Sequence, residues 1–203
     1  MLQKANVLGV KGVAAPSANL FGRVSPTTAL HVREAFASLT VLDGGPCQVG
    51  IESAIVDASQ GEPMLLRPGM LTVAALSAVA GREVRPIGKP KVASPLHAVP
   101  AAPGLLPSHY APRARVRLMD AADIASMAPS FQGALAVWVR EPLALPAHVH
   151  VKTMPSQAAD CAHALFADLR LLDAQRVEEI WVQTPPDGDA WAGVHDRLQR
   201  AAA

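Results

Sequence analysis

The sequence predicts an α/β protein built from two units. Short apolar runs of strand length alternate with stretches in which apolar residues recur every three or four positions, the spacing of one helix face. Between the two sets, prolines stand at positions 86, 90, 95, 100, 103, 107 and 112, and this density favours an extended connection over a helix or a central strand. We therefore expect one unit at 1–88, a proline-rich linker at 89–112 and a second unit at 113–203.

In the first unit, four short apolar runs bounded by glycine and proline are typical of strands. They lie at 13–15, 41–42, 51–56 and 64–66. Ser25 followed by Pro26 predicts a helix that ends near Leu39, because serine caps helices and proline fits the first turn. A second helix is expected over 72–80, with Gly81 as its stop. So few helices for these strands indicate part of a larger layered domain with a twisted sheet.

The second unit alternates more regularly. Its expected strands lie at 115–119, 134–139, 149–154 and 180–183. A long helix starts at Ser156, and a final helix carries an apolar stripe of Trp191, Val194 and Leu198. Strands that alternate with helices predict a mostly parallel, Rossmann-like sheet. The G-x-G-x-x-G fingerprint of dinucleotide-binding proteins does not occur.

Composition narrows the classes of protein. Half of the 203 residues are hydrophobic, enough for a sizeable core, and a net charge of +1 excludes a histone-like or acidic-tail protein. No apolar run approaches the roughly 20 residues that span a bilayer, and the stretch at 7–10 is too short for a signal peptide. Cys47 and Cys161 stand too far apart for a metal motif or a disulfide framework. We therefore expect a cytoplasmic protein without a membrane partner.

The first polar stretch, APSANLFGRVSPTT at 15–28, follows an expected strand. It holds Ser17 and Ser25 with Asn19 and Arg23 between them. Hydroxyls, backbone N–H groups and a helix N-terminus could bind an anion there. Spacing alone favours a helix cap and a surface turn.

The second stretch, LDGGPCQVGIESAIVD at 42–57, has glycines that suit a sharp turn or a close approach to a ligand. Glu52 and Ser53 open the next strand, and a tight loop between strands is the simpler interpretation. Cys47 has no histidine nearby in the sequence, so we expect a bystander thiol rather than a nucleophile.

Two further motifs carry single polar side chains. In LLRPG, Arg67 ends a strand, where a guanidinium can hold a phosphate or form a surface ion pair. In PSHYAPRA, Tyr110 either folds over a ligand as part of a lid or anchors the linker. His148 and His150 share one strand face but lack a third ligand, so no metal site is expected.

Six segments, APSAN, SPTT, DGGPC, GIES with IVD, LRPG and HYAP, together resemble the threonylcarbamoyl-AMP synthase family, in which a YrdC-like domain precedes a smaller C-terminal domain. The closing EEIWVQTPP and DRLQRAAA are similar to the end of that second domain, so the resemblance covers essentially the whole chain. It implies that ATP, L-threonine and bicarbonate react to give threonylcarbamoyl-AMP and pyrophosphate, with Mg²⁺ arriving on ATP. The product serves threonylcarbamoyl modification of tRNA, which suggests tRNA or downstream tRNA-modification proteins as partners.

The resemblance also implies roles for single residues. It places ATP-binding positions at Ser17, Ser25, Arg67 and Tyr110, and threonine-binding positions at Ser53 and Ala15. Many family members carry threonine where this chain has Ala15 and Ala54, so contacts at those two positions would come from the backbone. No catalytic nucleophile and no protein-bound metal are expected.

Three functions stay open. The leading one is the synthase; because the family's first domain begins well before the APSAN segment, we expect this chain alone to have little activity. The second is a non-catalytic nucleotide- or RNA-binding remnant of the same family, which the linker charge of +2 allows. The third is carbamoyl transfer of the hydrogenase-maturation kind, against which the HYAP linker and the second unit argue.

Overall fold

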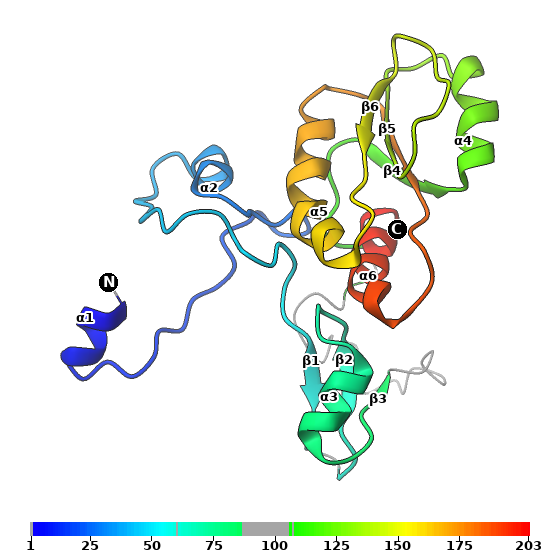
Figure 1. Cartoon of the computed structure of the whole chain (residues 1–203). Coiled ribbons are helices and arrows are strands. Elements are labelled where there is room, and N and C mark those ends of the chain that lie inside the picture. Colours follow the sequence, from blue (N-terminus) through cyan, green and yellow to red (C-terminus); the bar gives the residue numbers. More distant parts are fainter. Residues whose placement is uncertain (1, 60, 87–105, 107) are drawn as a thin grey trace, which may run out of the picture.

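The computed structural model describes residues 2–59, 61–86, 106 and 108–203. Two separate sheets form within these ranges, with helices beside each (Figure 1). The expected linker at 89–112 lies outside the described residues except for 106 and 108–112. None of the described helices combines the length and apolarity needed to cross a membrane.

The C-terminal unit contains the four-stranded parallel sheet that the alternation of strands and helices predicts. Its strands are β4 (Arg115–Met119), β5 (Leu135–Val139), β6 (His150–Thr153) and β7 (Glu179–Gln183), in the order β4-β7-β5-β6. Its helices are α4 (Ala121–Met127), α5 (Ala158–Asp173) and α6 (Ala192–Ala201). The Rossmann-like α/β interpretation is therefore confirmed.

Alternate side chains of β5 point to opposite faces of this sheet. Ala136 and Trp138 pack in the cluster that includes α5 and α6, whereas Val137 and Val139 pack against α4. All five residues of β5 are buried, because helices cover both faces, and this explains the continuous apolar run in the sequence.

The first unit has a smaller sheet of β1 (Ile55–Asp57), β2 (Met64–Arg67) and β3 (Arg85–Pro86). Strand β1 pairs antiparallel with β2, and β2 pairs parallel with β3. Helix α3 (Val73–Ala80) connects β2 to β3. The Thr72 hydroxyl accepts the amide of Ala75 at 3.1 Å, and Gly81 ends the helix with a φ of 66°.

Several expectations for residues 1–50 are wrong. The apolar runs at 13–15 and 41–42 are not strands in the structure. Helix α2 (Ala29–Ala35) begins after Thr28, whose hydroxyl accepts the His31 amide at 3.3 Å, and it ends four residues before Leu39. Ser25 is therefore not the cap of this helix, and its hydroxyl donates to the carboxylate of Glu52 instead. Helix α1 (Leu2–Val7), α4, β3 and two short 3-10 turns, Ala128–Ser130 and Asp189–Trp191, were not predicted.

Parts of the first unit are built into the C-terminal core. Val24 and Ile51 belong to the same buried cluster as Phe166 of α5. A side chain at Gly50 would collide with the carbonyl oxygens of Ala162 and His163, and the φ of Gly50 is 89°. Glycine is therefore required there for the chain to approach α5.

Candidate functional site

The carboxylate of Glu52 lies close to residues that the resemblance assigns to ATP, and Ser25 contacts it directly. The hydroxyl of Ser25 donates to Oε1 of Glu52 at 2.7 Å, and Ser25 is buried. Glu52 lies directly after Ile51, which is anchored in the C-terminal core. The position of this carboxylate is thus set by packing between the two units.

Arg197 of α6 holds the other side of Glu52. Its side chain is fully buried, with Nε 3.0 Å from Oε2 of Glu52 and Nη2 3.1 Å from the Glu52 carbonyl oxygen. Its Nη1 donates to the carbonyl oxygen of Pro68 at 2.7 Å. A buried guanidinium needs such partners, because an unpaired buried charge is very costly.

Tyr110, at the end of the linker segment, lies beside Arg197, and Ser25, Glu52, Arg197 and Tyr110 are called the cluster below. Its ring is 1% exposed, stacks on Phe166 with centroids 5.2 Å apart, and lies 5.5 Å from Cζ of Arg197. The backbone of Tyr110 has a φ of 61°, an uncommon conformation for a residue with a bulky side chain. Non-glycine residues in this region cluster at functional sites, where the surrounding structure holds them.

Arg67, the last residue of β2, lies next to the residue that follows Glu52. Its Nε and Nη2 both donate to the carbonyl oxygen of Ser53, at 3.2 and 3.0 Å, and the side chain is buried. The positive charge of Arg67 also acts on the rings of His109 and Tyr110. Arg67 and Tyr110 therefore lie near enough to interact electrostatically, although 43 positions separate them in the sequence.

The electrostatics of the cluster favour an ionised Glu52. Burial raises the pKa of the Glu52 carboxyl, but the hydrogen bond from Ser25 and the charge of Arg197 together bring that pKa below its usual value. Burial is the main cause that raises the pKa of Tyr110 and lowers the pKa of His109. A neutral histidine and a neutral phenol thus lie beside a charged Glu52–Arg197 pair.

The remaining predicted positions lie elsewhere on the surface. Ala15 and Ser17 are exposed, and within the described ranges no hydrogen bond or ion pair joins either of them to the cluster. Ser53 has an exposed side chain, and its carbonyl oxygen contacts Arg67. The structure therefore brings together Ser25, Arg67 and Tyr110, with Ser53 attached through its backbone.

The sequence alone does not predict a functional role for two residues of the cluster, Glu52 and Arg197. A signal for Arg197 exists, because it stands on the helical face of Val194, Leu198 and Ala201, all of which are buried. A charged residue on an apolar stripe indicates a buried ion pair. The identity of its partner, 145 positions away, has no such signal.

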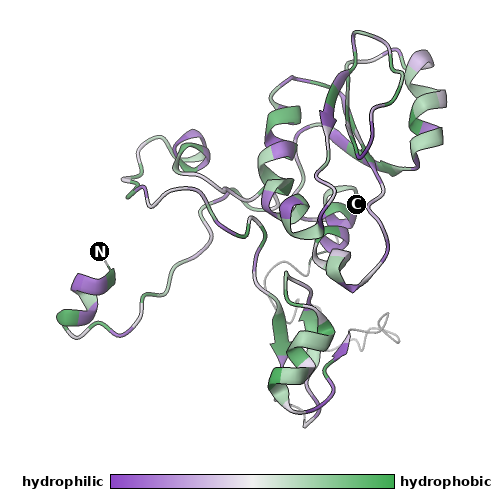
Figure 2. Cartoon of the chain, in the orientation of Figure 1, coloured by the Kyte–Doolittle hydropathy of each residue, from purple (hydrophilic) through white to green (hydrophobic). Residues whose placement is uncertain are grey.

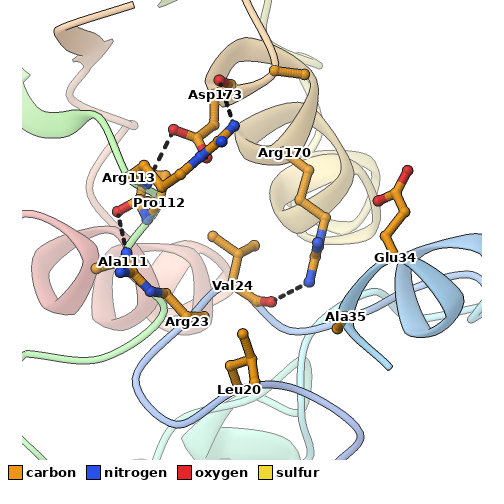
Figure 3. A pocket seen from close by; sticks show the side chains of 11 residues that line it. Leu20, Arg23, Val24, Glu34, Ala35, Ala111, Pro112, Arg113, Arg170 and Asp173 are labelled. Atoms are coloured by element: carbon orange, nitrogen blue, oxygen red, sulfur yellow. Dashed lines mark hydrogen bonds and ion pairs between the residues drawn. The ribbon is translucent and has the colours of Figure 1, made fainter. Parts of the chain in front are cut away.

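A cavity of about 450 Å³ lies beside the cluster, between α2, α5 and the chain after Tyr110 (Figure 3). Arg170 points to the carbonyl oxygen of Val24 at 2.6 Å, and Arg113 pairs with Asp173 at 3.1 Å. The hydrogen bonds of Arg170 to Val24 and Ser25 thus join the first unit to α5 at the wall of this cavity.

The cysteines differ in environment. Cys47 is exposed, whereas Cys161 is buried, and burial raises the pKa of its thiol to about 12. A thiol with so high a pKa is unreactive near neutral pH. Within the described part of the chain, no three His, Cys, Asp or Glu side chains are grouped so that they could hold a metal.

Two known families match successive parts of the chain. Residues 71–203 match the family described as "Threonylcarbamoyl-AMP synthase, C-terminal domain", and residues 1–69 match the family described as "Telomere recombination". The first match alone covers more than half of the 203 residues. The chain belongs to the threonylcarbamoyl-AMP synthase family.

Relatives within the synthase family are similar along most of the chain. The threonylcarbamoyl-AMP synthase of Bacillus subtilis is 32% identical over 200 residues, which cover 94% of this chain and 57% of that protein. A crystal structure of the Pyrococcus abyssi protein Sua5 with L-threonine is 29% identical with a TM-score of 0.79, covering 93% of this chain and 57% of Sua5. The chain thus spans little more than half the length of these relatives.

A second structure of the P. abyssi protein carries a replacement of a histidine and the tyrosine after it by alanine. This structure is 28% identical to the chain, has a TM-score of 0.78 and covers 93% of the chain and 56% of that protein. In this chain a histidine followed by a tyrosine occurs once in the sequence, as His109 and Tyr110 of the HYAP motif.

Proposed function

We propose that the chain acts in threonylcarbamoyl-AMP synthesis, as an L-threonylcarbamoyladenylate synthase that uses ATP, L-threonine and bicarbonate. The observation that carries the proposal is that three separate segments meet. Ser25 donates to Glu52, and Tyr110 packs beside Arg197. Arg67 binds the carbonyl oxygen of Ser53, the residue after Glu52. Threonine as a substrate is supported by the P. abyssi relative, whose structure contains L-threonine. The product would serve tRNA modification in the cytoplasm.

The chemistry needs positioning and charge stabilisation more than a protein nucleophile. The threonine amine adds to bicarbonate and water is lost, which gives a carbamate. A carbamate oxygen then attacks the α-phosphorus of ATP, the bond between that phosphorus and the oxygen bridging to the β-phosphate breaks, and pyrophosphate leaves. Guanidinium groups stabilise the charge on the phosphate oxygens during this transfer.

The contacts of each residue limit its role. Ser25 already donates its hydroxyl proton to Glu52, so its oxygen would accept a hydrogen bond from a ribose hydroxyl or the adenine amino group. Arg67 supplies positive charge next to the main chain of Ser53. The Tyr110 ring, which is packed against Phe166, would fix the linker end over the nucleotide.

Threonine and Mg²⁺ would depend less on side chains of the cluster. Ser53 offers an exposed hydroxyl to threonine, and Ala15 offers only its backbone. Since the described residues contain no metal cluster, Mg²⁺ would be held mainly by the phosphates of ATP.

The test is threonine-dependent release of pyrophosphate from ATP and bicarbonate, measured on the purified chain and on a version extended upstream where the encoding DNA allows. Because Ala15 and Ser17 are exposed and not joined to the cluster, we expect slow release from the chain and faster release from the extended version. Rapid pyrophosphate release by the chain alone would contradict the expectation that this chain has little activity. If neither version binds ATP, the proposal is overturned.

A variant tests the role of Arg67 directly. Arg67→Ala in the extended version should weaken ATP binding about tenfold or more, which corresponds to about 1.4 kcal/mol. Arg82→Ala is the matched control, because Arg82 is an exposed arginine of the same unit whose partner is the backbone of Gly61. Equal ATP affinity in Arg67→Ala and the parent protein would remove Arg67 from the site.

The alternative function is a nucleotide- or RNA-binding protein without turnover. The exposed positions of Ala15 and Ser17 favour it, because one threonine position and one ATP position of the predicted site then lie apart from the other site residues. Binding of tRNA that weakens as salt rises, without pyrophosphate release from any version, would favour this alternative.

A further inference from the structure

Arg197 connects the C-terminal helix α6 to two loops of the first unit at once. Its guanidinium donates to the carboxylate and the carbonyl of Glu52 and to the carbonyl of Pro68, with distances of 2.7 to 3.1 Å. Its side chain has no exposed surface. Glu52 precedes Ser53, whose carbonyl oxygen accepts from Arg67, and Pro68 follows Arg67 directly, so one side chain of α6 holds the backbone next to both partners of this contact.

Helix α6 also holds the end of the linker next to Tyr110. Asp196 accepts hydrogen bonds from Arg197 at 2.9 Å and from Arg200 at 2.9 and 3.0 Å. Arg200 donates to the Leu106 carbonyl at 2.6 Å, and its own carbonyl accepts the His109 amide at 3.1 Å. The chain before Tyr110 is thus tied at Leu106 and His109 to the same helix that carries Arg197.

We propose that Arg197 is a positioning residue of the nucleotide site, so that the C-terminal unit completes this site. Arg197 orients Glu52, Glu52 accepts the hydroxyl proton of Ser25, and the guanidinium lies against the ring of Tyr110. The assignment of ATP to these residues rests on the proposed function. The placement of the loops by Arg197 is a separate part of the inference and can be measured without a nucleotide.

The contacts explain why this position requires arginine. Nε and Nη2 donate to the carboxylate and to the carbonyl oxygen of Glu52, and Nη1 donates to the Pro68 carbonyl oxygen and to Oδ2 of Asp196. A lysine ammonium carries the same charge on one nitrogen and does not present this planar fork. Lysine should therefore preserve the ion pair with Glu52 and lose part of the loop anchoring.

The experiment compares Arg197→Met, Arg197→Lys and Glu52→Gln with the parent chain. ATP with Mg²⁺ is titrated by calorimetry, and amide hydrogen exchange is followed by mass spectrometry in peptides that cover 50–53 and 67–69. Arg117→Met is the matched control, since Arg117 belongs to β4 and pairs with Glu179 at 3.6 Å, outside the cluster. Far-ultraviolet circular dichroism confirms that each variant is folded.

The expected result is faster exchange at 50–53 and 67–69 in Arg197→Met, and ATP binding at least tenfold weaker. Arg197→Lys should lie between the parent and Arg197→Met in both exchange and affinity, and Arg117→Met should match the parent. The double variant Arg197→Met with Glu52→Gln should bind ATP no more weakly than the worse single variant, because the two residues act as one unit. If Arg197→Met fails to fold, Arg197→Lys and Glu52→Gln provide the same two readouts.

The two proposals fail in different ways. Unchanged exchange at 50–53 and 67–69 in the Arg197 variants overturns the positioning role, whatever their ATP affinity. Unchanged ATP affinity in a variant with faster exchange overturns the connection between Arg197 and the nucleotide. If the parent chain and the extended version both fail to bind ATP while exchange still responds to Arg197, the proposed function is wrong and the placement of the loops by Arg197 stands.

Discussion

Tyr110 is the residue at which backbone conformation and packing are most closely linked. Its φ of 61° turns the ring inward between Phe166 and Arg197. Removing a buried aromatic ring costs about 3–5 kcal/mol. Tyr110→Ala should therefore lower the free energy of unfolding by about that amount and weaken ATP binding, whereas Tyr110→Phe should retain the packing. Denaturant unfolding and ATP titration check this, and equal affinity in Tyr110→Ala would show that the linker end does not close over ATP.

Glu52 predicts a pH dependence of stability. Its pKa is lower in the folded chain than the usual 4.5, mainly through Ser25 and Arg197 acting against burial. A group whose folded pKa is depressed stabilises the fold above its unfolded pKa, and this contribution is lost as the pH falls through the folded value. The difference in unfolding free energy between the parent and Glu52→Gln should be largest near neutral pH and should shrink below about pH 4.5.

Comparing the two proteins at each pH removes the effect of the other carboxylates, which titrate in both. Denaturant unfolding from about pH 3 to pH 7 provides the measurement. A difference that stays constant over this range would mean that the Ser25 and Arg197 contacts do not favour the ionised form of Glu52.

At the scale of elements, the docking of α6 depends on a glycine. A side chain at Gly193 would stand 2.6 Å from the carbonyl oxygen of Gly69 and 2.8 Å from Cδ1 of Ile51. Alanine in a helix interior is normally more favourable than glycine by about 1 kcal/mol. Gly193→Ala should nevertheless destabilise the chain by about 1–3 kcal/mol, because the overpacked helix must move away from the first unit.

The control for this substitution lies on the same helix. Gln199 is exposed, so Gln199→Ala should leave the stability unchanged or raise it slightly. Thermal unfolding of the two variants beside the parent chain separates contact from helix propensity. An increase in stability in Gly193→Ala would show that the close approach of α6 to Gly69 is absent in solution.

The elements that could be predicted are those that complete their own hydrogen bonding and burial. The strand at 115–119 has the predicted bounds because it pairs along its whole length with β7. Apolar runs at 13–15 and 41–42 carry the same local signal but have no neighbouring strand in the structure. A strand of this length is not stable without a pairing partner, so local pattern alone could not decide these two cases.

The residues of the candidate site divide in the same way, into those that the sequence could predict and those that it could not. Motif resemblance identified Ser25, Arg67 and Tyr110, which the structure brings together. Arg197 and Glu52 could not be paired from sequence, because ion pairs between distant segments depend on how whole elements dock. The same reason explains Ser25, whose spacing suggested a helix cap and whose hydroxyl instead binds Glu52.

At the scale of the whole molecule, burial is uneven. Large apolar side chains are exposed along the first fifty residues, among them Leu2, Val7, Leu8, Phe21 and Leu42. Figure 1 shows α1 and the extended chain after it away from both sheets, and Figure 2 shows hydrophobic colour on part of α1. In the C-terminal unit, by contrast, β5 and β7 are enclosed by helices. Local stability should therefore be lowest in the exposed parts of the first unit and highest in the C-terminal unit, since local opening is least costly where few apolar contacts are made.

This uneven burial predicts which parts unfold together. Val24 and Ile51 pack in the C-terminal core, and Arg170 of α5 donates to the carbonyl of Val24. The segments at 22–27 and 50–53 should therefore be protected from hydrogen exchange up to the same denaturant concentration as α5. The small sheet of β1, β2 and β3 should open at a lower concentration, because short strands in a small sheet bury little apolar surface.

Native-state hydrogen exchange at increasing denaturant measures this order directly, peptide by peptide. Arg170→Met removes the two hydrogen bonds from α5 to Val24 and Ser25, so it should lower the protection of 22–27 and leave β7 unchanged. Exchange of 22–27 and 50–53 together with β1 and β2, rather than with α5, would mean that the first unit opens as one body. In that case the contacts with α5 and α6 would close only after the first unit has folded, and the nucleotide site would form last.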